Sequence, residues 1–226
     1  RYQKRIQATV TSETRHIAVE IASDKEQTNK MLADLGLPVP RQDLVRSTRE
    51  AVRAAERIGY PVVVKPYNAN HGRGVCLNLT NAEEVAAGYA TASEVTGRTC
   101  VVEKMITGFD HRMLVVGGEL IAVSKRVPGH VIGDGRHTIR ELVDIVNSDP
   151  RRGIGHEKVL TRIEIDHQAE KLMAEAQVTL DTVLDEGRIF YLRSTGNLST
   201  GGTAIDMTDV CHHDNREMAK RAALAI

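Results

Sequence analysis

Apolar residues recur at helical spacing in two stretches near the start of the chain. The first stretch covers residues 24–35, where Ser23 and Glu26 suit a capping box at its amino-terminal end. The second covers residues 47–58 and is followed by a glycine, which suits the end of a helix. We therefore predict two helices ahead of the first long strand.

Short apolar runs bounded by proline or glycine come next. Residues 61–66 predict a buried strand between two prolines, and the alternating residues 75–79 predict its partner. A helical pattern covers residues 81–95, and residues 99–104 predict a further strand. This order of elements indicates a sheet with helices packed against it.

Two alternating segments, residues 110–116 and 119–126, flank the pair Gly117-Gly118. Glycine tolerates the positive φ angles of a tight two-residue turn, so this pattern is a strong signal for a β-hairpin. The hairpin makes its two strands antiparallel, and no regular βαβ series is visible. The pattern therefore predicts a mixed α+β fold.

The region of residues 127–163 has a different character, with five glycines and a single helical pattern over residues 138–147. We predict that it is a long excursion over the surface, in the manner of a lid. Beyond it, residues 168–180 predict a helix and residues 187–193 a returning strand. A last helix is predicted over residues 214–226.

Composition narrows the class of protein. The chain has 226 residues, of which 41% are hydrophobic and 27% charged, and its 30 basic side chains balance 30 acidic ones. A net charge of zero and only 3% aromatic residues argue against nucleic-acid binding. No apolar run approaches the length of a membrane span. The three scattered cysteines form no CxxC pair, which favours a reducing cytoplasm over a disulfide framework.

Both ends of the sequence suggest a piece of a longer chain. The first residues include no initiator Met and no signal-peptide core, and the helix predicted up to Ile226 has no cap. We therefore expect further elements on both sides.

The first candidate site is the strand that carries Lys65-Pro66, together with the polar loop that leads to Gly72-Arg73-Gly74. Glycines let backbone N–H groups approach phosphate oxygens, and a lysine at the strand end supplies a point charge, so the pattern suits a polyphosphate. The alternative is a plain hairpin with a solvated lysine. The loop does not follow the Walker A pattern.

The second candidate site is the strand end from Cys100 to Ile106, followed by Asp110. A strand that runs out into a hinge offers backbone groups to an adenine edge. Carboxylates such as Glu103 can accept hydrogen bonds from an amino group or from ribose hydroxyls. The alternative is that both acids are ordinary solvated surface residues.

The third candidate is the run from Arg193 to Thr203, which gathers hydroxyls, glycines and one arginine at the exit of a strand. Such a loop can bind a carboxylate or a phosphate, and the alternative is a polar turn. A fourth cluster, Cys211-His212-His213-Asp214, is interpreted as the start of a helix with Asp214 as its cap, because adjacent residues rarely reach one metal ion.

Taken in order, these segments resemble ATP-grasp ligases, and among those the cyanophycin synthetase family. The resemblance covers nearly the whole chain, and the bifunctional glutathione synthetases share several of the motifs. The motifs that carry it are residues 7–12, 21–25, 61–66, 70–75, 127–128, 133–135, 149–153, 155–157 and 191–206. Asn68-Ala69 departs from the family pattern just before the glycine-rich core.

The resemblance implies a role for each matching position. Arg112 and Arg126 would be catalytic and face the reacting phosphate or the substrate carboxylate. The residues that would bind ATP, through its phosphates, adenine or ribose, are Lys25, Lys65, Asn70, His71, Gly72, Arg73, Gly74, Glu103, Lys104, Met105, Ile106 and Asp110. The residues that would bind the acceptor or the amino acid are Arg193, Ser199, Thr200, Gly201, Gly202 and Thr203.

The resemblance also implies an ATP-grasp fold that is incomplete at its C-terminus. Residues 1–60 would form a linker and first subdomain, residues 61–107 the phosphate-loop subdomain, and residues 108–226 a truncated catalytic subdomain that includes the loop region 127–163. Its Mg²⁺ ligands normally come from a later strand, so we expect no metal ligand in this chain and no activity from the isolated piece.

The activity implied by the resemblance is the ATP-dependent joining of a carboxylate to an amine. In cyanophycin synthetase this part adds aspartate to the polymer backbone, with ATP and Mg²⁺ as cofactors and a cyanophycin primer as partner, while a separate domain adds arginine. The implied protein is a cytoplasmic homo-oligomer with no nucleic-acid or membrane partner. Two alternatives stay open, namely a glutathione-type ligase and a nucleotide-binding module without catalysis.

Overall fold

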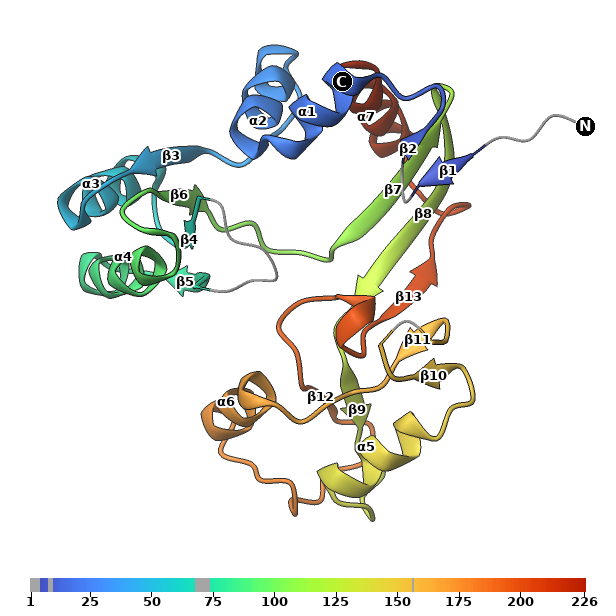
Figure 1. Cartoon of the computed structure of the whole chain (residues 1–226). Coiled ribbons are helices and arrows are strands. Elements are labelled where there is room, and N and C mark those ends of the chain that lie inside the picture. Colours follow the sequence, from blue (N-terminus) through green and yellow to red (C-terminus); the bar gives the residue numbers. More distant parts are fainter. Residues whose placement is uncertain (1–4, 8–9, 68–73, 156) are drawn as a thin grey trace, which may run out of the picture. The chain divides into compact units, whose positions relative to one another are not determined.

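The strands and helices predicted for the first half of the chain form one layered unit in the computed structural model, shown in Figure 1. The structure describes residues 5–7, 10–67, 74–155 and 157–226. Contacts between residues divide the chain into two compact units. The first contains residues 1–107 and 225–226, and the second contains residues 108–224.

The first unit is built on a four-stranded antiparallel sheet in the order β3-β6-β4-β5. Its strands are β3 (Gln42–Val45), β4 (Val62–Pro66), β5 (Cys76–Leu79) and β6 (Cys100–Lys104). The edge strand β3 precedes Tyr60, so the sheet takes strands from both sides of the boundary that we placed after residue 60.

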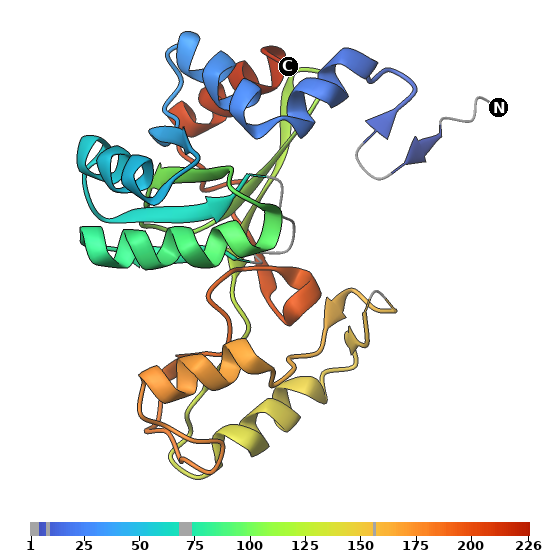
Figure 2. The ribbon, with the colours of Figure 1, turned by 60° about the vertical axis from the view of Figure 1, so that its left-hand side comes forward.

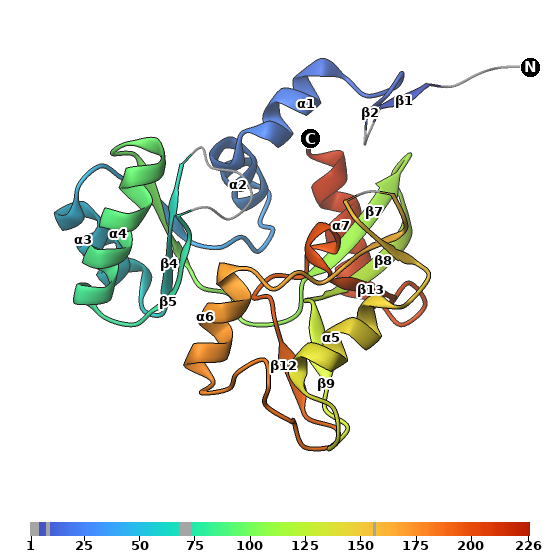
Figure 3. The same ribbon diagram turned by 60° about the horizontal axis from the view of Figure 1, so that its bottom comes forward.

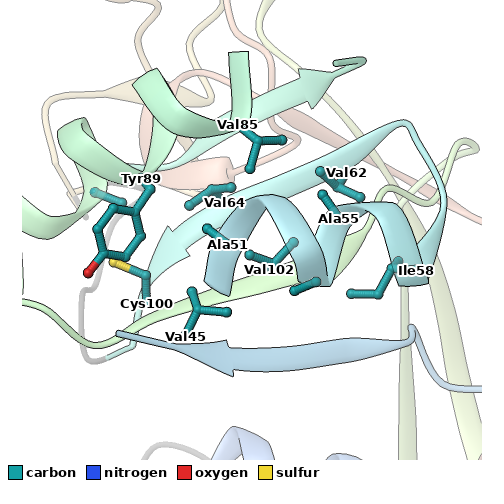
Figure 4. Close-up of a cluster of buried hydrophobic side chains, with 12 residues drawn as sticks. Val45, Ala51, Ala55, Ile58, Val62, Val64, Val85, Tyr89, Cys100 and Val102 are labelled. Atoms are coloured by element: carbon teal, nitrogen blue, oxygen red, sulfur yellow. The ribbon is translucent and has the colours of Figure 1, made fainter. Parts of the chain in front are cut away.

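Helices α3 (Thr48–Ile58) and α4 (Ala82–Thr96) lie side by side on one face of this sheet, as Figure 2 shows. Alternate strand residues point into the space between sheet and helices, where Val62, Val64 and Val102 are fully buried against small helix residues such as Ala51 and Ala55 (Figure 4). Side chains alternate along a strand, so their neighbours in sequence lie on the opposite face.

The helix starts were predicted with mixed success. Ser47 caps α3 by accepting from the N–H of Glu50 at 3.3 Å, which agrees with the helix start predicted at residue 47. For α2 (Lys25–Asp34) the predicted cap Ser23 is wrong, because Asp24 accepts from two backbone N–H groups at 3.0 Å. Ser23 instead ends α1 (His16–Ser23), a helix that the pattern did not predict, and donates to the carbonyl of Val19.

The second unit contains a three-stranded antiparallel sheet in the order β13-β8-β7. The predicted hairpin is confirmed as β7 (His111–Val116) and β8 (Glu119–Val127), and both glycines of its turn have positive φ angles. The strand β13 (Thr203–Asp206) was not predicted. Helix α7 (His213–Leu224) contacts β7 and β8.

A second hydrophobic core lies in the region that we predicted to be a surface excursion, so that prediction is wrong. The paired strands β9 (His130–Ile132) and β12 (Ile189–Tyr191) pack with α5 (Ile139–Asn147) and α6 (His167–Glu175), as Figure 3 shows. Its buried residues are Val131, Ile139, Leu142, Val143, Ile163, Ala169, Met173, Val178, Leu184, Phe190 and Leu192. Apolar positions that are far apart in sequence are joined here by tertiary packing.

Two further predicted boundaries differ from the structure. The helix predicted over residues 168–180 ends at Glu175, because the chain turns at Gln177, whose φ is 55°. Helix α7 begins at His213, so Asp214 lies inside its first turn and is not the cap.

No helix among the described residues is long and apolar enough to cross a membrane.

The remaining elements are short. A small hairpin is formed by β1 (Ile6–Gln7) and β2 (Val10–Thr11). Two strands of two residues, β10 (Arg152–Gly153) and β11 (Leu160–Thr161), pair in parallel. The 3-10 turn η1 (Leu198–Thr200) contacts β11, which brings the end of the predicted excursion against the polar loop of residues 196–202.

Candidate functional site

Lys65 and Glu103 meet on the sheet face opposite α3 and α4. They lie on the neighbouring strands β4 and β6, and the Nζ atom of Lys65 is 2.7 Å from Oε2 of Glu103. Both side chains are about three-quarters buried, with 25% and 21% exposed. The nearly buried Val63 and Val101 lie on the same face. This sheet face therefore places one cation and one acceptor beside buried apolar side chains.

A pocket of about 1090 Å³ opens beside this pair within the first unit. It is lined by Lys65 and Tyr67 from the end of β4, by β3, and by α2, which contributes Lys30 and Asp24 at its cap. Small-molecule sites in proteins typically enclose about 300–1,000 Å³. The pocket therefore has room for a molecule the size of a nucleotide.

Several of the predicted nucleotide-binding residues cannot be placed. Asn70, His71, Gly72 and Arg73 lie outside the described residues. Lys25 begins α2, but its side chain is outside the described part as well.

Gly74 is held by packing as well as by conformation. Its φ is 68°, and a Cβ atom there would approach Cγ2 of Val95 to 2.7 Å and Cγ of Pro66 to 3.0 Å. Gly74 therefore lies so close to Val95 of α4 and to Pro66 that any larger residue at this position would require those side chains to shift.

The segment from Lys104 to Ile106 differs from the predicted adenine hinge in one respect. The N–H of Lys104 donates to the carbonyl of Arg41 at 2.8 Å, and that of Met105 donates to Pro61 at 3.2 Å. The ammonium of Lys104 holds two more carbonyls, those of Gly59 and Tyr60. The backbone N–H groups of Lys104 and Met105 are therefore already bonded within the protein. Of the three predicted positions, the N–H of Ile106 is the one that we still propose as a donor to adenine.

A second pocket, of about 410 Å³, lies wholly within the second unit. Three cations line it, namely Arg112 from β7, Arg126 from β8 and Lys158 from the turn before β11. The other lining residues are Val159, Thr161, Gly196, Asn197, Leu198 and Ser199, and none of these is acidic. The structure thus brings together both predicted catalytic arginines and Ser199.

Sequence reasoning missed three residues of this pocket, Lys158, Val159 and Thr161. The parallel pairing of β10 with β11 carries them to the loop of residues 196–199, and no local pattern predicts a pairing of two-residue strands. Asp110 lies beside the pocket and forms an ion pair with Arg112 at 3.1 Å. That exposed pair leaves the guanidinium open to exchange its partner for a ligand carboxylate.

Arg193 does not fit the direct substrate contact that we expected. Its side chain is 5% exposed, and its guanidinium lies 2.5 Å from Asp166 and donates to the carbonyls of Glu164 and Thr200. Its donors are therefore committed inside the protein, and its contact with the loop goes to the backbone of Thr200.

The glycines of the same loop have packing roles. Gly201 has a φ of 90°, and a Cβ atom there would come within 2.7 Å of Cγ1 of Ile163. A Cβ atom on Gly202 would come within 2.6 Å of the carbonyl oxygen of Asn197. Thr203 begins β13 and pairs with Val127. Of the six predicted acceptor residues, only Ser199 is among the residues that line the second pocket.

Asp166 is held ionised by its surroundings. Burial by itself would raise the pKa of its carboxyl, but hydrogen bonds from Arg193 and from the N–H groups of Ala169 and Gln168 outweigh burial and lower that pKa. Asp166 also caps α6 through those two N–H groups. One carboxylate therefore ties α6 to the arginine that holds the loop.

No group of three His, Cys, Asp or Glu side chains suited to a metal ion occurs among the described residues. His212 and Asp214 interact with each other at the start of α7. We therefore assign no metal ligand within the described ranges.

Comparison with known proteins gives a consistent result. An ATP-grasp domain model matches residues 19–130. Cyanophycin synthetases from Crocosphaera subtropica and Trichormus variabilis are 49% and 48% identical over 100% and 99% of this chain. The chain spans about a quarter of those proteins, 26% and 25% of their lengths.

A solved structure extends the likeness to three dimensions. The bifunctional glutathione synthetase from Pasteurella multocida matches 96% of this chain and 29% of its own, with 32% identity and a TM-score of 0.66. The mixed α+β architecture with antiparallel sheets agrees with this match. The chain therefore has the ATP-grasp fold, and its whole length is similar to a segment that makes up about a quarter of each of these cyanophycin synthetases.

Proposed function

We propose that this chain is the nucleotide- and acceptor-binding part of an ATP-dependent carboxylate–amine ligase that extends the cyanophycin backbone with aspartate. The observation that carries the proposal is the pocket that Arg112, Arg126 and Ser199 all line, with no acidic side chain among its described lining residues. The similarity to cyanophycin synthetases over the whole chain supports the choice of reaction.

The proposed chemistry follows from charge. A carboxylate is a poor acyl donor, and transfer of a phosphoryl group from ATP to one of its oxygens gives an acyl phosphate with a good leaving group. The amine of aspartate then attacks the acyl carbon, the amide bond forms, and phosphate leaves. Arg112 and Arg126 would stabilise the charge on the phosphoryl and carboxylate oxygens as they react.

Lys65 would hold phosphates of ATP, and the face that it shares with Val63 and Val101 would hold the base. A bound polyphosphate competes with Glu103 for the ammonium of Lys65, and it offers several oxygens where the carboxylate now offers one. Mg²⁺ would neutralise part of the phosphate charge. The described residues include no group of three His, Cys, Asp or Glu side chains that would hold this ion.

The test is a phosphate-release assay of the full-length protein with ATP, a β-aspartyl-arginine primer, and aspartate or arginine. We expect release that depends on both primer and aspartate. Absence of release with aspartate plus primer would overturn the proposal. As part of the same proposal, the protein acts in the cytoplasm as a homo-oligomer.

A glutathione-type ligase is the second candidate, because the matching solved structure is a bifunctional glutathione synthetase. It is discriminated in the same assay by replacing primer and aspartate with the substrates of glutathione synthesis. ATP binding without release in either arm would instead favour a non-catalytic nucleotide-binding module.

A further inference from the structure

Two buried arginines from separate elements grip the loop of residues 198–202. Arg152 on β10 is 6% exposed, and Arg193, two residues after β12, is 4% exposed. Arg152 donates from Nη1 to the carbonyl of Gly201 at 3.0 Å, and Arg193 donates from Nε to the carbonyl of Thr200 at 3.3 Å. Two consecutive carbonyls of the loop are therefore each held by a guanidinium.

Arg152 joins the loop to a second segment of the chain, strand β11. The same Nη1 atom that binds Gly201 also donates to the carbonyl of Thr161 at 2.6 Å. Thr161 and the residues just before Thr200 all line the pocket that contains Arg112 and Arg126. One nitrogen atom thus joins two segments of the chain that line that pocket.

Burial of the Arg152 guanidinium carries a free-energy cost, because the charge is removed from water. Arg193 has the carboxylate of Asp166 at 2.5 Å, whereas Arg152 forms no ion pair with any residue in the described ranges. Burial lowers the pKa of the Arg152 guanidinium, against an opposing influence of Asp149. A buried charge is costly unless hydrogen bonds satisfy it, so the carbonyls of Thr161 and Gly201 are the contacts that hold this guanidinium in place.

The loop between the two arginines has little room to adjust. Gly201 requires the positive φ that it adopts, and both Gly201 and Gly202 face backbone atoms closer than a Cβ would tolerate. A loop packed this closely has one stable path while its carbonyls are held. Release of one carbonyl would therefore displace Ser199 relative to Arg112 and Arg126.

We propose that Arg152 is a positioning residue that locks the segment of residues 158–161 onto the loop that carries Ser199 and so shapes the acceptor pocket. The identity of the acceptor rests on the proposed function. The contact by which Arg152 joins the two segments does not depend on that function. Arg152 touches no reacting atom in this proposal. It acts on acceptor binding through Gly201 and Thr161.

The test compares Arg152→Met, which keeps bulk and removes the donors, with Arg152→Lys, which keeps the charge. Arg151→Met is the matched control, because Arg151 is adjacent, 71% exposed in its side chain and bonded to Asp149. Two readouts are measured in the full-length protein. The first is hydrogen exchange at the amides of residues 198–202, and the second is KM for the primer and for ATP.

In the Arg152→Met variant we expect hydrogen exchange at the loop amides to be at least about tenfold faster, because a buried hydrogen bond to a charged group is lost. We also expect KM for the primer to rise about tenfold while KM for ATP stays unchanged. Arg152→Lys recovers part of both changes, and Arg151→Met alters neither.

Unchanged exchange in a folded Arg152→Met or Arg152→Lys protein would overturn the lock. Equal rises in KM for ATP and primer would overturn the positioning role. If the unmutated protein shows no primer-dependent phosphate release, the proposed function fails, and hydrogen exchange still decides the lock by itself.

Discussion

Single residues in this chain owe their roles to their partners more than to their type. Lys65 and Lys104 lie on adjacent strands but have different partners. Lys65 forms an ion pair with the carboxylate of Glu103, whereas Lys104 donates to two backbone carbonyls. Arg193 and Arg112 differ in the same way, since the first is buried and committed and the second lines a pocket. Exposure and partner choice therefore separate structural cations from candidate binding cations.

Replacing Lys65 with Met tests the nucleotide face. We expect Kd for ATP to rise at least tenfold, because a hydrogen bond between an ammonium and a phosphate contributes about 1.5–3 kcal/mol. Isothermal titration calorimetry of the full-length protein measures this change. Lys171→Met, at an exposed helix position, is the control. Equal ATP affinity in the two variants would remove Lys65 from the site.

His137 provides a pH-dependent contact on the surface. The hydrogen bond and charge of Asp134, whose carboxylate lies 2.6 Å from Nδ1, raise the pKa of His137 above 6.5. A raised pKa means that the contribution to stability is complete below pH 6.5 and is lost as the pH rises through the folded-state pKa. NMR titration of the imidazole measures it, and Asp134→Asn should return the pKa to its ordinary range. A wild-type pKa at or below 6.5 would contradict this.

At the scale of elements, side-chain caps fix several helix starts, although the sequence predicted them with mixed success. Thr138 and Glu141 form a complete capping box at the start of α5, with the Thr138 N–H and the Glu141 carboxylate 2.8 Å apart. The same logic placed the start of α3. It failed for α2 because a serine and an aspartate stand side by side, and only the conformation of the chain decides which one is the cap.

Removal of the α5 cap should weaken the second core, because α5 contributes Ile139, Leu142 and Val143 to it. We expect Thr138→Ala to lower the free energy of unfolding by about 1 kcal/mol. Asp144→Ala, on the exposed face of the same helix, should change it by less than about 0.5 kcal/mol. Urea unfolding monitored by circular dichroism gives both values, and similar losses in the two variants would argue against the cap.

At the scale of the molecule, two hydrophobic cores without a common residue stabilise two units. The first core combines a sheet face with two helices. The second gathers strands and helices from residues 131–192. Each unit carries one of the candidate pockets.

A cavity in one core should therefore act mainly on its own unit. Leu184 is fully buried in the second core, and Leu184→Ala should destabilise that unit by about 2–5 kcal/mol. Hydrogen exchange should speed up for amides of β9, β12 and α5, while amides of β4 and β6 keep their protection. Val64→Ala in the first core is the reciprocal variant, and equal loss of protection in both units would show that they unfold together.

Local features of the sequence were enough to predict several elements in both units. The apolar run before Lys65, the glycine pair at residues 117–118 and the cap at Ser47 each depend on neighbours within a few residues. The chemistry of such segments is fixed by their own side chains and backbone angles, so the strand, the hairpin and α3 could be predicted.

Tertiary structure alone decided the rest, because the deciding contacts join residues that are distant in sequence. The glycine-rich region became a core only through packing of Val131 and Ile139 against Leu184 and Phe190. Arg152 reaches Gly201 across 49 positions, and Lys158 enters a pocket built largely by other elements. The sequence by itself determined the residue types available for phosphate and carboxylate chemistry, and the fold determined which of them face a ligand and which hold the loop in place.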